Sequence, residues 1–582
     1  MGRRLSLVGA TLLLTATMAH AARFMTGVVE GYYGRPWTHE ARRDVIRFLG
    51  AKRLTTFVYG PKNDPFHRDE WRTPYPEAEL SELAFTAREA RRAKVRFVYA
   101  LSPALDICYS CPDDTRALRR KLRQLARAGI RRFALFFDDA PLRLSHPDDV
   151  ARFGGDGPDA LARAQARIVR RTNAWLRRRG LPALVFMVPT DYFGTACSPY
   201  LTALDETLPR STIVGWTGTG VIPATVTAEQ ARLRRDCLGG RRLLLWDNFP
   251  VNDTVLSSNL HLGPFTGRAA DLGPALGGGH LLNPMTQAHA SLVALGAAAA
   301  YFADPAGYDA EAAWRAALHA LAPPGTLDVL AEQTRSSALD LTDAHALTAA
   351  VDAVAATYAG SHWSAAVAAL DAEIGRQQSA ADGIEAVLGG STLGMEIAPW
   401  VDELRAHLAE ARLARDLLRA LKPSFHDLRL VDVDGARHVQ GHVRPPNVVL
   451  ADVLGPQVAA PRPAVDLPTL LACLGPFLTA DIAFCPHLGL NVHGKRLYVV
   501  LDAGFTVVTG LNQHDRLLAT AALAWFDWQG RQMGPPEPSL LVDGVAAPLD
   551  PDGRFDVPVA PAGPVTLVAA TTAGDATAVT LP

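Results

Sequence analysis

Strand-like and helix-like segments alternate from about residue 24 to 300, and this alternation restricts the possible folds more than any other feature. Amphipathic helical patterns separate most of the strands, some with a clear start signal such as Thr38 before residues 39–48. Short apolar segments closed by Gly, Pro, Asn, Asp or Thr predict eight strands: 27–31, 55–60, 96–103, 133–138, 183–190, 212–218, 243–248 and 279–283. This pattern favours an α/β fold, a closed (β/α)8 TIM barrel. A doubly wound sheet is the alternative, but residues 31–36 lack its glycine-rich phosphate loop.

The rest of the chain divides into regions of different composition. With the barrel domain predicted at 22–304, residues 305–423 are rich in Ala, Leu, Glu and Arg and are predicted to form an α-helical bundle domain. Residues 424–582 contain more Pro, Gly and Val, and apolar and polar residues alternate near the end. This C-terminal region is therefore predicted to be β-rich at least from 540, whereas 424–540 gives no clear pattern.

The first 21 residues have the three parts of a signal peptide. Arg3 and Arg4 are positively charged, residues 5–18 are mostly apolar, and Ala19-His20-Ala21 offers a small-x-small cleavage site. We therefore expect a secreted or periplasmic protein, by either general or twin-arginine export. No later segment has the ~20 uninterrupted apolar residues of a transmembrane helix, so no membrane span is expected.

The six cysteines lie in three pairs that are close in sequence: Cys108 with Cys111, Cys197 with Cys237, and Cys473 with Cys485. An oxidising compartment would allow disulfides, although sequence alone does not select their connectivity. The first pair has Cys-x-x-Cys spacing, but no second pair of metal ligands follows it. Disulfides or free thiols are thus favoured over zinc, and we expect neither a metal nor a cofactor.

The balance of charge argues against a nucleic-acid partner. Lys and Arg total 58 and Asp and Glu 59, a formal net charge of −1, so the chain lacks the basic surplus that phosphate backbones require. Basic runs at 119–121 and 177–179 fall within helical patterns and are interpreted as solvated helix faces.

Polar and aromatic residues concentrate where the predicted strands end, which is where a barrel builds its active site. Carboxylates can exchange protons, amides and lysines can hydrogen-bond hydroxyl groups, and aromatic rings can stack on sugars. The set therefore suits sugar hydrolysis. It comprises Glu30, Tyr33, Lys62, Asp64, Asp106, Asp138, Asp139, Asp191, Tyr192, Trp216, Trp246, Asp247, Asn248, Asp253 and Asn283.

Two adjacent carboxylates, Asp138 and Asp139, directly follow an apolar strand. Neighbouring carboxylates repel each other, and a partly desolvated one is driven towards protonation. One can then act as a general acid while the other stays ionised. Taken alone, such a doublet can also cap a helix or end a loop, which is our interpretation of Asp148-Asp149.

A series of motifs places this doublet in a specific context. In chain order they are Gly27–Trp37, Tyr59–Asp64 with His67-Arg68, Leu101–Asp106, Phe136–Asp139, Pro189–Tyr192 with Gly194-Thr195, Trp216–Gly218, Trp246–Asn248 with Asn252-Asp253, and Leu282–Pro284. Together they resemble glycoside hydrolase family 84, the β-N-acetylglucosaminidases that include the O-GlcNAcases. The resemblance covers roughly 24–290, and the helices up to about 420 are similar to the family's following helical domain.

The resemblance implies a retaining exo-β-N-acetylglucosaminidase that releases terminal β-linked N-acetylglucosamine from glycans or glycoproteins. In this family the 2-acetamido oxygen of the sugar attacks the anomeric carbon and forms an oxazoline. Asp138 matches the residue that holds the acetamide N–H, and Asp139 matches the general acid and base. Adjacent residues of a strand point in opposite directions, so we expect the pair just past the regular strand, where the backbone turns.

Further residues match the family's sugar-binding positions. The resemblance implies that the Gly31 carbonyl and the side chains of Lys62, Asp253 and Asn283 bind the sugar, the three side chains through its hydroxyl groups. It also implies that Tyr192 and Asn248 lie near the acetamide group, and that Trp246 forms a wall of the acetamide pocket. Asp247 lies between Trp246 and Asn248 on one strand, so its side chain is expected to point away from the pocket. Asn63 and Phe193 depart from the family pattern, in loops outside the catalytic pair.

Two other functions remain open at this level. A different barrel hexosaminidase, of chitinase or hyaluronidase type, predicts an Asp-x-x-Asp-x-Asp-x-Glu run or an Asp-Glu pair in place of the observed Asp-Asp. A non-catalytic glycan-binding protein need not retain the acid. The physiological glycan and the oligomeric state are not predicted from the sequence.

Overall fold

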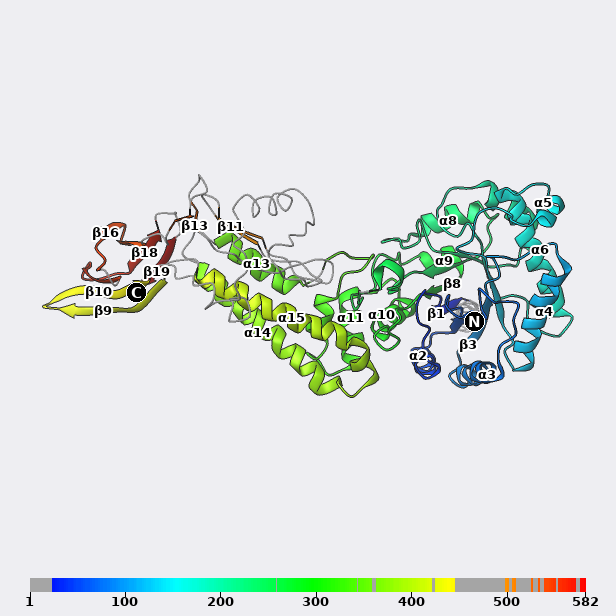
Figure 1. The fold of residues 1–582 in the computed structure, drawn as a ribbon, viewed down its shortest axis with the longest axis horizontal. Helices are drawn as coiled ribbons and strands as arrows, with labels where there is room; N and C mark the ends of the chain where they lie inside the picture. The colour runs from blue at the N-terminus through cyan, green and yellow to red at the C-terminus, as the bar shows by residue number, and fades with distance from the viewer. Residues whose placement is uncertain are drawn as a thin grey trace, which may run out of the picture. The chain divides into compact units, whose positions relative to one another are not determined.

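The computed structural model describes residues 24–444, apart from 258, 343, 358–362 and 421–423. Of the C-terminal region it describes 498–501, 505–508, 525–526, 532–533, 538–550, 553–571 and 576–582. The predicted signal peptide and the pair Cys473 and Cys485 lie outside these residues. The chain divides into two compact units, one of 1–342 with 388–397 and one of 343–387 with 398–582 (Figure 1).

Eight parallel strands close into a barrel in the first unit, which confirms the predicted fold class. Each strand pairs with its neighbours in sequence, and the first pairs with the last. The strands are β1 (Met25–Glu30), β2 (Thr56–Tyr59), β3 (Arg96–Leu101), β4 (Phe133–Phe136), β5 (Met187–Val188), β6 (Val214–Trp216), β7 (Leu243–Asp247) and β8 (Gly277–Leu282).

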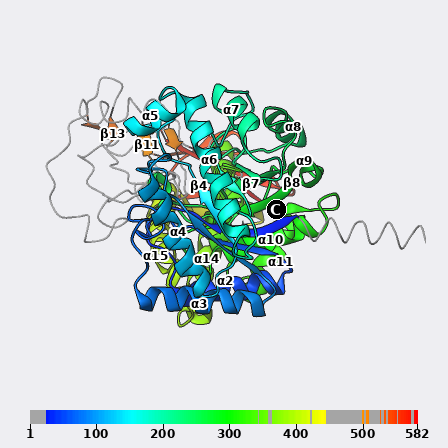
Figure 2. The ribbon, with the colours of Figure 1, turned by 90° about the vertical axis from the view of Figure 1, so that its right-hand side faces the viewer.

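Helices surround the barrel, as the end-on view in Figure 2 shows. Local signals start several of them: the Thr38 side chain accepts a hydrogen bond from the Ala41 N–H at 3.2 Å, and Thr227 forms a capping box with Gln230. The helices of this unit are α2 (His39–Ala51), α3 (Glu77–Arg92), α4 (Pro112–Arg127), α5 (Pro147–Phe153), α6 (Pro158–Arg177), α7 (Pro199–Thr207), α8 (Ala228–Asp236), α9 (Leu272–Leu276), α10 (Leu292–Ala303), α11 (Ala310–Leu321) and α12 (Asp328–Gln333), with the 3-10 turn η1 (Thr254–Leu256).

Alternate residues of each strand enter two different hydrophobic cores. Val28 packs between the sheet and the helices, whereas its neighbour Val29 packs inside the barrel. Phe136 and Trp246 belong to the interior core, with ring centroids 5.1 Å apart. The interior is therefore filled with side chains, and its polar groups gather where the strands end.

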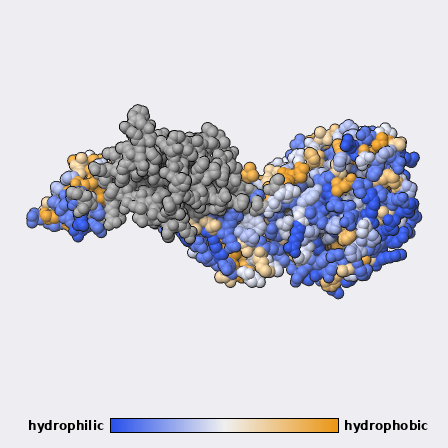
Figure 3. Space-filling model, in the orientation of Figure 1, coloured by the Kyte–Doolittle hydropathy of each residue, from blue (hydrophilic) through white to orange (hydrophobic). Residues whose placement is uncertain are grey.

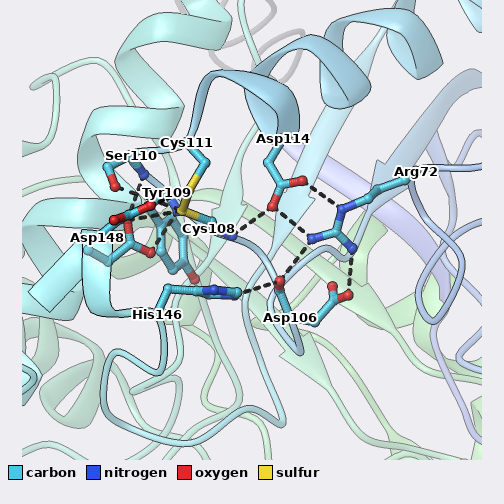
Figure 4. The surroundings of a disulfide bond; sticks show 10 residues. Arg72, Asp106, Cys108, Tyr109, Ser110, Cys111, Asp114, His146 and Asp148 are labelled. Atoms are coloured by element: carbon cyan, nitrogen blue, oxygen red, sulfur yellow. Dashed lines mark hydrogen bonds and ion pairs between the residues drawn. A yellow bond between two sulfur atoms is a disulfide. The ribbon is translucent and has the colours of Figure 1, made fainter.

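Two disulfides confirm two of the predicted cysteine pairs: Cys108–Cys111 and Cys197–Cys237. The first lies directly before α4, in the segment that follows β3 (Figure 4). Arg72 fixes the same segment by pairing with Asp106 and Asp114 (Figure 4).

Three helices and several antiparallel sheets make up the described part of the second unit. The helices are α13 (His345–Thr357), α14 (Trp363–Leu388) and α15 (Thr392–Ala420), and ion pairs such as Arg405 with Glu385 at 2.6 Å join α14 to α15. The strands are β9 (Ser424–Val433), β10 (Ala436–Arg444), β11 (Tyr498–Leu501), β12 (Phe505–Val508), β13 (Trp525–Phe526), β14 (Gln532–Met533), β15 (Pro538–Val542), β16 (Val545–Ala547), β17 (Arg554–Pro558), β18 (Val565–Thr571) and β19 (Ala576–Leu581).

The predicted β-rich character of the C-terminal region is confirmed by two sheets, ordered β17-β10-β9 and β16-β15-β18-β19. Most side chains on the visible surface of the barrel unit are hydrophilic (Figure 3). Within the described residues, no helix is both long and apolar enough to cross a membrane.

Candidate active site

A pocket of about 170 Å³ opens where the barrel strands end. Segments that follow β1, β2, β4, β5, β6, β7 and β8 contribute to it, so the pocket is built at the carboxyl edge of the sheet. It brings together all nine residues assigned to the site from the sequence: Gly31, Lys62, Asp138, Asp139, Tyr192, Trp246, Asn248, Asp253 and Asn283. Its other lining residues are Tyr33, Val188, Thr217, Val221, Ile222, Val251 and Thr254.

Asp138 and Asp139 both reach the pocket because the chain turns directly after β4. The regular strand ends at Phe136, and Asp139 has a left-handed backbone with φ 52°. Asp tolerates this conformation better than most residues, since its short polar side chain can hydrogen-bond nearby. The prediction that the pair lies just past the strand, at a turn, is confirmed.

Asp138 is buried, with 5 % of its surface exposed, and it has one charged neighbour and one free oxygen. The Lys62 ammonium group, also buried, contacts Oδ2. Oδ1 is buried and accepts no hydrogen bond from the described residues. A buried acceptor without a partner is unfavourable, so Oδ1 is well suited to accept a hydrogen bond from a ligand.

Asp139 accepts hydrogen bonds from several donors. The Tyr33 hydroxyl donates to Oδ2 at 2.8 Å, the Tyr192 hydroxyl donates to Oδ1 at 2.9 Å, and Lys62 Nζ lies 3.1 Å from Oδ2. Burial alone would raise the pKa of Asp139, but the Lys62 charge and these hydrogen bonds together hold that pKa below its ordinary value. The carboxylate is therefore ionised in the ligand-free site.

The two tyrosines remain donors throughout the neutral pH range. Burial, and then the negative charge of Asp139, raises the pKa of both Tyr33 and Tyr192. Tyr33 also connects the site to another carboxylate, since its backbone N–H donates to Asp253 Oδ2 at 2.7 Å. Burial raises the pKa of Asp253, and the charge of Asp139 adds to this effect.

A chain of amide hydrogen bonds fixes the opposite wall. Trp246 Nε1 and Asn283 Nδ2 both donate to Asn248 Oδ1, at 2.8 and 2.9 Å, while Asn248 Nδ2 donates to the Val221 carbonyl at 2.8 Å. The Gly31 N–H donates to Asn283 Oδ1 at 3.2 Å. These bonds orient the Asn248 and Asn283 amides and hold the indole ring of Trp246 against the pocket.

Several polar residues predicted at the same barrel face do not line the pocket, because other side chains engage them. Glu30 pairs with Arg42 in a buried contact at 2.6 Å, and Asp247 pairs with Arg268 at 2.6 Å. The orientation of Asp247 away from the pocket agrees with its position between two site residues. Asp64, Asp106, Asp191 and Trp216 also lie outside the lining.

Two contributors were not among these nine residues, although Tyr33 was among those expected at this barrel face. Tyr33, within the first motif, donates to Asp139 and lines the pocket. Arg68, in the His67-Arg68 motif, is buried with Nη1 3.8 Å from Asp139 Oδ2, and its guanidinium carbon lies 5.4 Å from the centroid of the Tyr33 ring. The motifs contained both residues, but only the fold shows which carboxylate they approach.

A family model described as β-N-acetylglucosaminidase matches residues 26–335, a range that includes every site residue above. The chain belongs to this family. The resemblance seen in the motifs is thereby confirmed, and the barrel and its pocket are the matched part of the chain.

Named relatives agree with this assignment. Protein O-GlcNAcase from Rattus norvegicus is 36% identical over 294 residues, which cover 50% of this chain and 31% of the relative. The enzyme of the same name from Mus musculus is 36% identical over 288 residues, which cover 48% and 30%. The chain thus spans about a third of the length of these curated relatives.

Solved structures extend the similarity beyond the barrel. An O-GlcNAc hydrolase variant from Thermobaculum terrenum has a TM-score of 0.65 and 29% identity, covering 69% of this chain and 85% of that one. The structure of CpGH84B has a TM-score of 0.60 and 27% identity, covering 68% and 69%.

Proposed function

We propose that this protein is a retaining exo-β-N-acetylglucosaminidase that hydrolyses terminal β-linked N-acetylglucosamine from glycans or glycoproteins by substrate-assisted catalysis. The observation that carries the proposal is the pair of carboxylates after β4, which share Lys62 but differ in their remaining partners. Asp138 has a free buried acceptor and Asp139 has several donors, so the two carboxylates are equipped for different tasks. A pocket of about 170 Å³ suits a single terminal sugar.

Asp138 orients the acetamide group. Its free Oδ1 accepts the acetamide N–H, and the resulting hydrogen bond holds the acetamide oxygen behind the anomeric carbon. As that oxygen attacks, positive charge develops on the acetamide, and an ionised carboxylate stabilises it. Lys62 keeps Asp138 fixed through Oδ2, and Tyr192 and Asn248 are near enough to the same part of the pocket to contact the acetamide.

Asp139 transfers the proton. In the ligand-free site it is ionised, and substrate changes its surroundings by expelling water and by drawing the Lys62 ammonium towards a sugar hydroxyl. Both changes raise the pKa of Asp139, which allows it to protonate the leaving oxygen. After the aglycone departs, the carboxylate accepts a proton from the water that opens the oxazoline, and Tyr33 and Tyr192 stabilise the restored charge.

The remaining residues hold the sugar ring. The Lys62 ammonium group, the Asp253 carboxyl group and the Asn283 amide are available to bind the sugar hydroxyl groups. The Gly31 carbonyl adds an acceptor, and the Trp246 indole forms the apolar wall behind the acetamide methyl group.

We further propose that the N-terminal signal peptide directs export of the protein to the periplasm or the medium. Its substrates would then be glycans or glycoproteins outside the cytoplasm.

The decisive experiment compares aryl glycosides that share a leaving group. An aryl N-acetyl-β-glucosaminide should be hydrolysed rapidly, and the corresponding β-glucoside, which lacks the acetamide nucleophile, should not be turned over. A thiazoline that mimics the oxazoline should inhibit. Equal rates on the two glycosides would contradict substrate assistance, and no hydrolysis of either by folded protein would favour a glycan-binding role.

A further inference from the structure

A second cavity, of about 690 Å³, lies between α3 and α4 on the outside of the barrel. The two helices are neighbours in Figures 1 and 2. The cavity shares no lining residue with the pocket at the strand ends. It is lined by Pro74, Glu77, Leu80, Ser81, Ala84, Arg88, Arg120, Arg123, Gln124, Arg127 and Ala128, and we call it the arginine groove.

Helical spacing explains how the arginines come together. Arg120, Arg123 and Arg127 follow one another at intervals of three and four residues, so they share one face of α4 over about 10 Å. Lys121, between them in sequence, is buried and donates to the Phe66 carbonyl at 2.8 Å. The interpretation of residues 119–121 as one solvated face is therefore wrong for Lys121, because the helix directs it towards the barrel.

The charges of the groove are not neutralised within the described part of the chain. None of the four groove arginines (88, 120, 123 and 127) forms an ion pair there, and Glu77 is the groove's one carboxylate. Neighbouring arginines outside the groove do pair, such as Arg92 with Glu89 and Arg116 with Asp113. Uncompensated guanidinium groups along a hollow create a concentrated positive potential.

Other arginines of the barrel unit also lie close to one another. Burial, and then the charges of Arg171, Arg178 and Arg179, lowers the pKa of Arg119 on the same helix α4. Burial and the charge of Arg132 likewise lower the pKa of Arg96. Arginines thus also lie close together elsewhere in the barrel unit, although the chain as a whole is close to neutral.

We propose that the arginine groove binds an acidic polysaccharide, a chain that carries carboxylate or sulfate groups. The planar guanidinium group matches both oxyanions with two parallel hydrogen bonds. A row of three arginines over about 10 Å requires several anionic groups along one ligand, which a polymer provides and a single small ion does not. The groove lining contains no aromatic ring, so it lacks the stacking platforms that single-stranded nucleic acids use.

The test measures binding of a fluorescent heparin octasaccharide by anisotropy, with the full-length protein at low and physiological salt. The groove variant is Arg120→Gln/Arg123→Gln/Arg127→Gln. The matched control, Arg91→Gln/Arg92→Gln/Arg116→Gln, removes the same charge from exposed positions of the same two helices outside the groove. The groove variant should bind about tenfold more weakly, with a shallower salt dependence, and the control should stay within about twofold of the wild type.

Further ligands separate the possible sources of the anions. If an oligogalacturonate competes with heparin, carboxylate groups are sufficient for binding. If it does not compete, binding requires sulfate groups. Either result supports the proposal. Equal weakening of the two variants, no binding by the wild type, or tighter binding of a single-stranded oligonucleotide of equal charge would overturn it. Hydrolysis of a small aryl N-acetylglucosaminide should be the same in both variants, since neither alters the pocket at the strand ends.

Discussion

Gly31→Ala should damage the pocket mainly through a steric collision with Trp246. A Cβ atom at residue 31 would lie 2.2 Å from Trp246 Cζ2 and 2.5 Å from Cη2. Carbon atoms pack at about 3.5–4.0 Å, so the ring must move by roughly 1.5 Å. It cannot retreat into the barrel, because Phe136 packs there with its ring centroid 5.1 Å away. The indole must therefore move into the pocket or away from Asn248, which it now orients.

The size of the effect follows from that displacement. A misplacement of about 1 Å in a reacting group or its support costs about 100-fold in rate, and overpacking of this kind costs roughly 1–3 kcal/mol of stability. We expect kcat/KM for an aryl N-acetyl-β-glucosaminide to fall about 100-fold, while thermal unfolding shows a protein that is still folded.

Two controls test the reasoning. Gly220→Ala makes the same chemical change in the segment after β6, where a Cβ atom has no neighbour within 4 Å, and it should leave activity unchanged. In a Trp246→Leu background the collision is removed, so Gly31→Ala should add little further loss. Wild-type kcat/KM for Gly31→Ala, or the same loss with and without the indole, would refute the steric explanation.

Three other changes test different parts of the site and its support. Asp139→Ala should reduce hydrolysis of glycosides with poor leaving groups at least about 100-fold more than that of activated aryl glycosides; equal losses would contradict its role as the acid. Tyr192→Phe removes a hydrogen bond that lowers the pKa of Asp139, so the limb of the kcat/KM–pH profile set by Asp139 should move to higher pH, and an unshifted limb would count against that contact. Asp247→Asn leaves Arg268 buried without its counter-charge and should cost about 3–5 kcal/mol in urea unfolding at neutral pH. Burial would raise the pKa of Asp247, but Arg268 and His280 depress it further than burial raises it. Its stabilisation is therefore present above the unfolded pKa of about 3.9 and lost as pH falls towards the folded value, so wild type and variant should converge in acid.

The barrel could be predicted from the sequence because each strand carries its own local signal. Each of the eight predicted segments overlaps a strand, yet the fifth was predicted over 183–190 and forms a ladder only at Met187–Val188. An apolar segment shows that residues are buried, but the length of a ladder depends on the neighbouring strands. The hairpin of β9 and β10 was missed, although Asp434 and Gly435, both with positive φ, are a typical turn signal between strands.

The site could be predicted only in part, because the sequence does not show which carboxylates are neutralised by an ion pair in the folded chain. Fifteen polar or aromatic residues were expected at one barrel face, and the sequence contains no local sign that Glu30 is neutralised by Arg42 or Asp247 by Arg268. Those partners lie 12 and 21 residues away in sequence and on other elements. Whether a carboxylate is free to act therefore depends on contacts that exist only in the folded chain.

The fold holds Asp139 in a backbone conformation that local preferences disfavour. Its left-handed backbone costs on the order of 1–2 kcal/mol relative to ordinary conformations. Hydrogen bonds to charged groups contribute about 1.5–3 kcal/mol each, so the contacts with Lys62, Tyr33 and Tyr192 can offset that cost. The same contacts hold the pKa of Asp139 below its ordinary value. The turn that places both carboxylates on one side of the pocket and the low pKa of Asp139 thus depend on one set of donors.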